Sequence, residues 1–209
     1  MPYLFRGRYG IQHGGRNLMD VFKWLLGVVL IGLTACGGNT LRGGVIEPPQ
    51  AAAELNLTDQ IGRLFRLDTQ RGHVVMIYFG YTYCPDLCPT TLADLAAARR
   101  KLGQDADRVQ VVFISVDPLR DTPDKLGEYV AHFDPTFLAL SGAEADLKRV
   151  LNGYQVIAQK RVLPDAAGYT IDHTSFTYVI DRHGALREMI LFGAAVDDIA
   201  NDMRVLLKE

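Results

Sequence analysis

Residues 73–90 read HVVMIYFGYTYCPDLCPT, and their pattern indicates the type of fold. Its first part, residues 73–79, is a dense apolar run of strand length. Residues 90–102 carry apolar side chains at helical spacing, and Gly103 ends that pattern. A buried strand that runs through a short loop into a helix begins a βαβ unit, and α/β folds place their sites in such loops.

Strands and helices continue to alternate beyond this stretch. Further strands are predicted at 108–116, 137–140, 155–160, 174–180 and 185–191, and helices at 122–132, 143–151 and 196–207. Residues 55–59 and 63–67 predict a hairpin upstream. The last two strands are joined by a two-residue turn, so they must be antiparallel. The sequence therefore predicts an α/β domain, a thioredoxin-like mixed sheet with flanking helices and an N-terminal β-hairpin.

Composition excludes several classes of protein. The chain has 209 residues, of which 48% are hydrophobic and 22% charged, which is globular and unlike a disordered, collagen-like or coiled-coil protein. That length allows one domain of common size. A net charge of −2 argues against binding to nucleic acid. The three cysteines are too few and too clustered for a disulfide scaffold.

The first 35 residues predict a lipoprotein signal peptide. The uncharged run at 24–35, WLLGVVLIGLTA, follows a positively charged start. It is shorter than the ~20 residues that span a bilayer, but it has the length of a signal-peptide apolar core. The run ends in LTACG at 33–37, which resembles the bacterial lipobox and predicts lipidation of Cys36. A plain cleaved leader and a short membrane anchor with an incidental cysteine are the alternatives, and Met19 is an alternative start to Met1.

Residues 36–53 are predicted to be a flexible membrane tether, because they are rich in Gly, Pro and Ala and show no periodic apolar face. The folded domain is then expected at 54–209. Stable anchoring needs more than one acyl chain. The expected location is extracytoplasmic, on the periplasmic or cell-surface side of a membrane, where disulfides are permitted.

Cys84 and Cys88 carry the predicted chemistry. Four residues apart across a helix start, they point the same way, and the positive end of the helix dipole favours the thiolate form. A thiolate is both a nucleophile and a metal ligand. This spacing is one residue wider than Cys-x-x-Cys, so the loop can close a disulfide or seat a metal between two sulfurs. Two half-buried structural cysteines are the alternative, which their scarcity in the domain and their shared loop disfavour.

Three polar residues elsewhere are candidates for the same site. His173 lies just before a predicted buried strand, where a single histidine is more often structural than a ligand. The other four histidines are assigned to the leader, the surface or packing. Asp117 and Asp121 follow the strand at 108–116, on the edge predicted for Cys84. Asp121 is interpreted as a helix cap, whereas Asp117 fits equally a turn and a residue that supports the site or docks a partner.

Four stretches of the chain resemble the Sco/SenC family of copper-binding, thioredoxin-like proteins that help assemble cytochrome c oxidase. They are YFGYTY at 78–83, CPDLCPTTL at 84–92, SVDPLRDTP at 115–123 and DHTSFTYVID at 172–181, and the resemblance covers nearly all of 54–209. It implies copper as the bound metal, with Cys84, Cys88 and His173 as its three ligands. Tyr83 is a departure, since many relatives place a histidine there that is not a ligand.

The chemistry of these residue types agrees with copper. Two soft thiolates and one imidazole suit Cu(I), and three ligands leave a low-coordinate site from which the metal can be handed on. A closed four-ligand site would favour structural zinc. Spacing alone also allows a catalytic zinc site with an open position, although no acidic residue of the motifs is an evident base for hydrolysis.

The leading hypothesis is a membrane-anchored extracytoplasmic copper metallochaperone that delivers copper to the binuclear copper centre of cytochrome c oxidase. Its expected partners are the copper-bearing oxidase subunit and the membrane, with another periplasmic copper chaperone as a further candidate. We expect a monomer that binds no nucleic acid. One alternative is a thiol–disulfide oxidoreductase that reduces partner cysteines with the redox-active pair Cys84 and Cys88. A less favoured alternative is a peroxiredoxin-like peroxidase, suggested by the fold and by Cys-Pro-Thr at 88–90.

Overall fold

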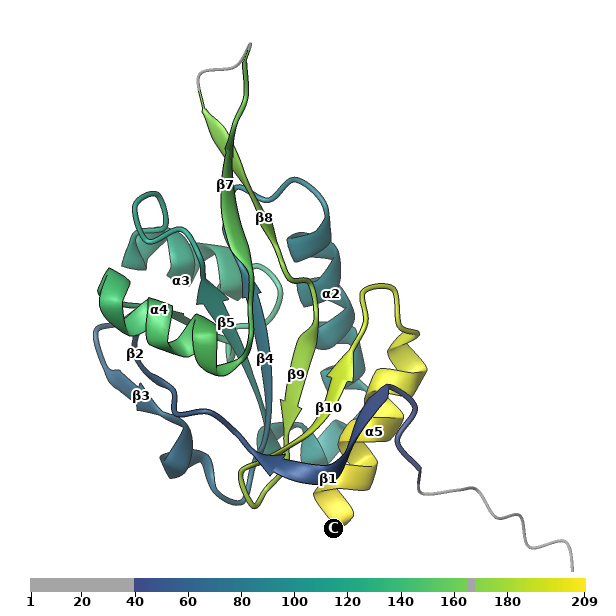
Figure 1. The fold of residues 1–209 in the computed structure, drawn as a ribbon. Helices are drawn as coiled ribbons and strands as arrows, with labels where there is room; N and C mark the ends of the chain where they lie inside the picture. The colour runs from purple at the N-terminus through teal and green to yellow at the C-terminus, as the bar shows by residue number, and fades with distance from the viewer. Residues whose placement is uncertain (1–39, 165–167) are drawn as a thin grey trace, which may run out of the picture. The chain divides into compact units, whose positions relative to one another are not determined.

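The computed structural model describes residues 40–164 and 168–209, so the predicted leader and Cys36 lie outside the described residues. Within those two ranges, eight strands form one sheet in the order β1-β10-β9-β4-β5-β6-β2-β3, and β7 pairs with β8 in a separate hairpin (Figure 1). The strands are β1 Gly44–Ala51, β2 Asn56–Asp59, β3 Leu64–Arg66, β4 Val74–Gly80, β5 Val109–Ser115, β6 Leu138–Ser141, β7 Ala158–Val162, β8 Tyr169–His173, β9 Thr177–Ile180 and β10 Ala185–Ile190. The α-helices are α2 Leu87–Arg100, α3 Pro123–Ala131, α4 Glu144–Gly153 and α5 Val196–Lys208, and short 3₁₀ turns are η1 Leu67–Gln70 and η2 Gly103–Arg108.

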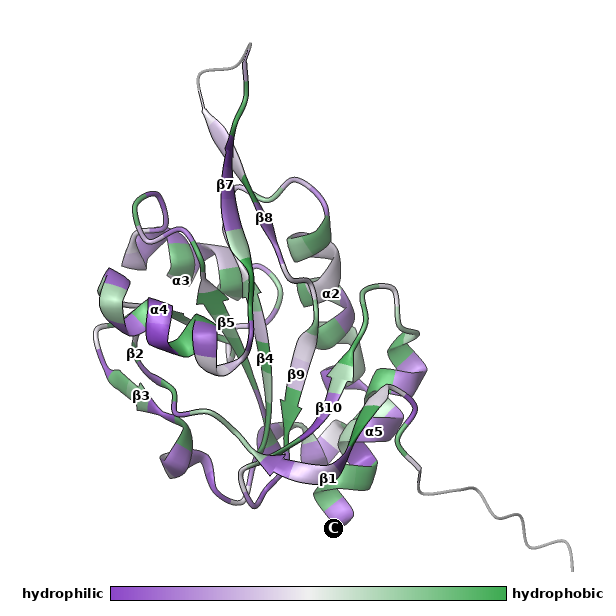
Figure 2. Ribbon diagram, in the orientation of Figure 1, coloured by the Kyte–Doolittle hydropathy of each residue, from purple (hydrophilic) through white to green (hydrophobic). Residues whose placement is uncertain are grey.

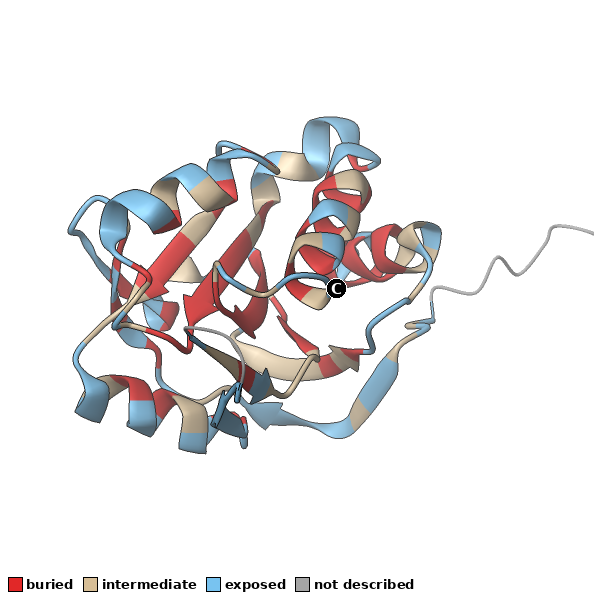
Figure 3. Ribbon diagram, turned by 90° about the horizontal axis from the view of Figure 1, so that it is seen from above, coloured by how far each residue is buried: buried red, intermediate tan, exposed pale blue. Residues whose placement is uncertain are grey.

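Strands β4 and β5 form the centre of the sheet. They are parallel, in register from Val74↔Val109 to Gly80↔Ser115. Every residue of β4 is buried, as Figure 3 shows for the central strands, because helices cover both faces of a parallel sheet. The equal register brings the carboxyl ends of the two strands to one edge. The loop with the two cysteines and the loop that begins with Val116 therefore leave the sheet side by side.

Alternate side chains of the central strands enter two cores. Met76 and Tyr78 pack with residues of α2, α3 and α5 on one face of the sheet. Ile77 and Phe79 pack with residues of α4 on the other face. Figure 2 shows the apolar central strands between helices whose colouring alternates along their length, as expected for amphipathic helices. The two cores hold β4 and β5 rigidly, so the loop with the cysteines starts from a strand end whose position is fixed.

The predicted fold class is confirmed, with one mixed sheet between flanking helices. The predicted hairpin is present as β2 and β3, which pair through Leu57↔Phe65. The last two strands, β9 and β10, are antiparallel as expected. No helix in the described ranges combines the length and the hydropathy that crossing a bilayer requires.

The prediction of a flexible tether as far as residue 53 is wrong for β1. Gly44–Ala51 pairs antiparallel with β10, from Gly44↔Met189 to Ala51↔Ala185. The register shifts between Val45 and Gln50, the segment that contains the two prolines, which lack the amide needed for ladder hydrogen bonds. Strand β1 covers an edge of β10 that would otherwise expose unpaired backbone groups. The folded domain thus begins by residue 44 rather than 54.

The segment before β1 lies over a buried pair of carboxyl groups. Asp202 accepts hydrogen bonds from the backbone amides of Arg42 and Gly43, at 3.0 and 3.2 Å. Glu188 on β10 is completely buried beside it. A Cβ atom on Gly43 would lie 1.8 Å from Glu188 Oε1, so only glycine allows this approach. Burial, with the neighbouring Asp202 carboxylate, raises the pKa of Glu188 to about 8.

Replacing Glu188 with glutamine is expected to stabilise the protein at alkaline pH. The folded state holds a proton on Glu188 that the unfolded state releases above about pH 4.5, so this group's contribution to stability falls as pH rises towards 8. The variant lacks this loss, and its advantage should grow to about 5 kcal/mol above pH 8. Urea unfolding at pH 5, 7 and 8.5 measures the difference. The exposed Glu128→Gln is the control, and parallel pH profiles for wild type and Glu188→Gln would contradict the prediction.

The chain around His173 also differs from expectation. The predicted strand at 174–180 is shorter, since β9 covers Thr177–Ile180, and Tyr169–His173 forms the unpredicted strand β8. Its partner β7 is exposed along its whole length. Strand β7 overlaps the strand predicted at 155–160, whereas β8 buries only Ile171 and so lacks the apolar alternation by which strands are predicted.

Candidate metal centre

The two cysteines lie in the loop between β4 and α2. After Gly80, a turn closes with a hydrogen bond of 3.1 Å from the amide of Cys84 to the carbonyl of Tyr81. Helix α2 begins at Leu87, earlier than predicted, so Cys88 lies in its first turn and is fully buried, while Cys84 is half-buried. A Cβ atom on Gly80 would lie 2.7 Å from Cys88 Sγ. Glycine at this strand end therefore lets the buried sulfur pack against the sheet.

Asp121 fixes this loop to the end of β5. It is almost completely buried, and its carboxylate accepts hydrogen bonds from the Thr82 amide (3.1 Å), the Thr82 hydroxyl (2.6 Å) and the Ser115 hydroxyl (2.6 Å). The interpretation of Asp121 as a helix cap is wrong. The cap of α3 is Thr122, whose Oγ1 accepts from the amide of Lys125 at 3.4 Å. The carboxylate of Asp121 instead joins the cysteine loop to the neighbouring strand.

Replacing Asp121 with alanine is expected to destabilise the protein by about 3–5 kcal/mol, because three buried or half-buried donors lose a charged acceptor. Urea unfolding measures the change. Asp124→Ala, an exposed acidic residue in the first turn of α3, is the control and should cost less than about 1 kcal/mol. A loss for Asp121→Ala no larger than that of the control would contradict this role.

His173 closes the site from the other side. It is the last residue of β8, and its Nδ1 lies 3.0 Å from the carbonyl oxygen of Thr174. A carbonyl oxygen only accepts, so Nδ1 carries the proton and the lone pair is on Nε2. Nε2 lies 3.5 Å from Cys88 Sγ. The rings of Tyr78 and Tyr81 meet the imidazole edge-on, with centroids 6.2 and 5.9 Å away, and so hold its orientation.

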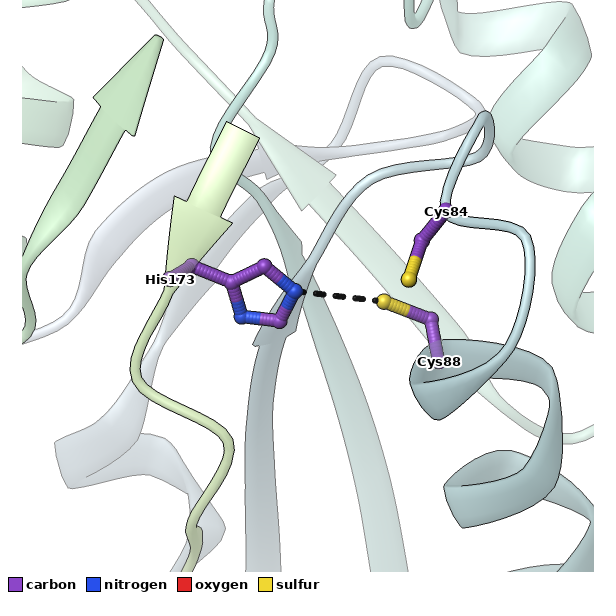
Figure 4. A group of neighbouring side chains, drawn as sticks. All are labelled: Cys84, Cys88 and His173. Atoms are coloured by element: carbon purple, nitrogen blue, oxygen red, sulfur yellow. Dashed lines mark hydrogen bonds between the residues drawn. The ribbon is translucent and has the colours of Figure 1, made fainter. Parts of the chain in front are cut away.

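One donor atom from each of Cys84, Cys88 and His173 comes together in this way (Figure 4). All three atoms lie within 4.8 Å of one another. Donors that share one ion at about 2.0–2.3 Å, as sulfur and nitrogen do with zinc, lie roughly 3.5–4 Å apart. The site is therefore nearly preformed, and small side-chain shifts would bring all three donors onto a single ion. Soft sulfur donors with an imidazole, partly shielded from water, fit copper.

The two sulfurs have opposite acid–base behaviour. A hydrogen bond from the thiol of Cys88 lowers the pKa of Cys84 to about 4, and His173 adds to this effect. The pKa of Cys88 is raised, first by its hydrogen bond to Cys84 and then by burial. The hydroxyl of Tyr78 also donates to Cys88 Sγ, at 3.9 Å. At neutral pH the reduced site thus presents a thiolate at its accessible position and a thiol below it.

Asp117 lies next to this group but does not join it. It is buried, and in the described part of the chain its side chain is bound by Arg120 and by the Tyr169 hydroxyl, the latter at 2.8 Å. Sequence reasoning missed Tyr78 and Tyr81, which surround the imidazole. For Tyr78, its place within a fully buried strand was the available signal, since its hydroxyl needs a polar partner; Tyr81 follows that strand and carried no such signal.

The SCO1/SenC family model matches residues 45–208, beginning within β1. The SCO2-like protein RP587 of Rickettsia prowazekii is 45% identical over 129 residues, which cover 61% of this chain and 63% of that protein. Among solved structures, copper-bound ScoI of Bradyrhizobium japonicum has a TM-score of 0.69 and 38% identity, covering 75% of this chain and 99% of that chain. Copper-bound yeast Sco1 has a TM-score of 0.68 and 29% identity, covering 77% and 90%.

The curated match spans less than two thirds of the Rickettsia protein, whereas the family model spans most of the present chain, from β1 to the end of α5. The residues that the family model matches include the loop with the two cysteines and the strand that ends at His173. This protein therefore belongs to the SCO1/SenC family.

Proposed function

We propose that this protein binds copper through Cys84, Cys88 and His173 and delivers it during the assembly of cytochrome c oxidase. One observation carries the proposal: three donors from segments 85 residues apart lie within 4.8 Å of one another. The related proteins of Bradyrhizobium japonicum and yeast have copper bound in their structures.

The arrangement suits a copper ion that is bound and later released to another protein. Two sulfurs and one nitrogen favour Cu(I) but leave its coordination number low, so a ligand of the receiving protein can join before these ligands leave. Cys88 is buried, whereas Cys84 and His173 are partly exposed. The client would therefore approach from the side of Cys84 and His173. Loading requires Cys88 to lose its proton, so copper binding releases a proton from the site.

The proposed client is the copper-bearing subunit of cytochrome c oxidase. This identification comes from the family resemblance. The proposed location is the extracytoplasmic face of a membrane, with the chain held by a lipid on Cys36 after removal of residues 1–35. Since the amides of Arg42 and Gly43 already bind Asp202 of the domain, the tether of this proposal is short, starting at Cys36 and ending before residue 42. A short tether would keep the site close to a membrane-embedded client.

A second function is favoured by the acid–base asymmetry of the two cysteines. The Cys84 thiolate is placed to attack a client disulfide, forming a mixed disulfide and releasing one client thiolate. Cys88, once deprotonated, then attacks the Cys84 sulfur, which closes the Cys84–Cys88 disulfide and releases the second client thiolate. Two electrons pass to the client, whose reduced cysteines can then take copper.

The alanine variant of His173 separates the two functions. Purified protein, loaded with Cu(I), is mixed with the reduced, copper-free domain of the oxidase subunit, and copper in the client is measured after separation. In parallel, copper-free protein is mixed with the oxidised client, and free client thiols are counted. We expect His173→Ala to fail in copper transfer but to reduce the client, and Cys84→Ser to fail in both. Copper loading and transfer by His173→Ala at the wild-type level would overturn the proposed copper site.

A further inference from the structure

The β7–β8 hairpin carries His173 but lies outside the eight-stranded sheet. Its strands pair with each other, from Ala158↔His173 to Val162↔Tyr169, and Figure 1 shows them rising beyond the carboxyl ends of β4 and β5. A two-stranded hairpin is marginally stable by itself. The position of the imidazole therefore depends on how the base of this hairpin is held against the domain.

One face of β8 makes the contacts that hold it. Side chains alternate along a strand, so Tyr169, Ile171 and His173 share a face. Ile171 is buried in the core on that face. On the other face, Asp172 is exposed and pairs with Arg161 across the hairpin. The inward face thus places Tyr169 and His173 four residues apart, on either side of a core anchor.

Arg120 binds the inward face of β8 and the cysteine loop together. Its guanidinium lies 3.6 Å from the centroid of the Tyr169 ring, and its Nη1 donates to the Tyr169 carbonyl at 3.0 Å. Its Nε donates to Asp117, which also accepts from the Tyr169 hydroxyl. The same guanidinium lies 4.7 Å from the ring of Tyr83, the residue before Cys84. One side chain therefore contacts both segments that supply the metal donors.

Two lysines extend this contact at its ends. Lys160 of β7 lies 3.5 Å from the centroid of the Tyr169 ring. Lys125 of α3 lies 5.1 Å from the Tyr83 ring and donates to its hydroxyl at 2.8 Å. Cations and rings therefore alternate from the hairpin to α3, with Arg120 in the middle. A planar guanidinium can stack flat on a ring while its N–H groups donate hydrogen bonds in its own plane, whereas an ammonium group is a compact charge with no plane to stack.

We propose that Arg120 is a positioning residue that holds the His173 hairpin against the Cys84 loop and so sets the reach of the imidazole to the two sulfurs. The inference rests on the proposed copper site. None of the described contacts of Arg120 involves a donor atom of that site, so its effect on copper must pass through the placement of His173.

A double-mutant cycle tests this dependence on His173. Cu(I) affinity is measured by competition with a chromophoric chelator for the wild type, Arg120→Leu, His173→Ala and the double variant. Loss of a residue that supports a metal ligand lowers affinity about 10- to 100-fold, which we expect for Arg120→Leu in the wild-type background. In the His173→Ala background we expect Arg120→Leu to lower the affinity less than about threefold, because no imidazole remains to be misplaced. In copper-free protein, hydrogen exchange at the amides of β8 should become faster in Arg120→Leu.

Arg161→Leu is the matched control, since it removes an arginine from the outward face of the same hairpin and should leave copper affinity unchanged. If Arg120→Leu does not fold, the same double-mutant cycle is measured with Arg120→Lys and with Tyr169→Leu in its place. Equal losses in both backgrounds, or no loss in the wild-type background, would overturn the positioning role. An unchanged affinity in His173→Ala itself would instead overturn the proposed copper site, so the two failures are distinguishable.

Discussion

Replacing His173 with alanine is expected to lower Cu(I) affinity more than about 100-fold, a larger loss than that caused by removing a residue that only supports a ligand. The imidazole supplies one of three donors, and its Nε2 faces Cys88 Sγ at 3.5 Å. Two sulfurs would remain, so binding should weaken rather than vanish. Because the ring is only partly buried, the variant should keep most of its stability, with a loss below about 2 kcal/mol. Competition with a chromophoric Cu(I) chelator under reducing conditions gives the affinity.

His183→Ala is the control for this experiment, since His183 is an exposed histidine in the turn before β10. It should bind copper as the wild type does. An affinity of His173→Ala equal to that of this control would show that the imidazole is not a ligand.

Closing a disulfide between Cys84 and Cys88 is expected to abolish Cu(I) binding, and reduction should restore it. Both cysteines are free in the structure. A disulfide would remove both sulfur donors and leave one imidazole, which is too few ligands to retain Cu(I). The measurement is copper content by elemental analysis after oxidation, copper exposure and desalting, repeated after treatment with a dithiol.

Cys84→Ser, treated in the same way, is the control for this second prediction. It cannot form the internal disulfide, so oxidation should not change its already weak copper binding. If the oxidised wild type binds Cu(I) as tightly as the reduced form, the dithiol is not the copper site.

The centre of the fold could be predicted because its signals are local. The apolar runs of β4 and β5 are continuous, since both faces of these strands are covered, and the glycine after α2 marks its end. Strand β1 could not be predicted in the same way. It is almost wholly exposed, and its place in the sheet comes from backbone pairing with β10, about 140 residues away in the chain.

The site could be predicted only in part from the residues themselves. Cys84 and Cys88 stand out by their spacing at a helix start, but His173 was singled out by resemblance to a family. Its reach to the sulfurs depends on the exposed hairpin of β7 and β8, which has no strong sequence pattern. Asp121 was misread because Asp-Thr-Pro is typical of a helix start, and its bonds to Thr82 and Ser115 depend on the parallel register of β4 and β5.

Two sulfurs and one imidazole are expected to form a single copper centre. X-ray absorption at the copper edge of the Cu(I)-loaded, reduced protein tests it most directly, because it counts the donors by element. We expect two sulfurs and one nitrogen for the wild type, with the nitrogen lost in His173→Ala and both sulfurs retained. A wild-type spectrum without the nitrogen, or with the same nitrogen in His173→Ala, would contradict it.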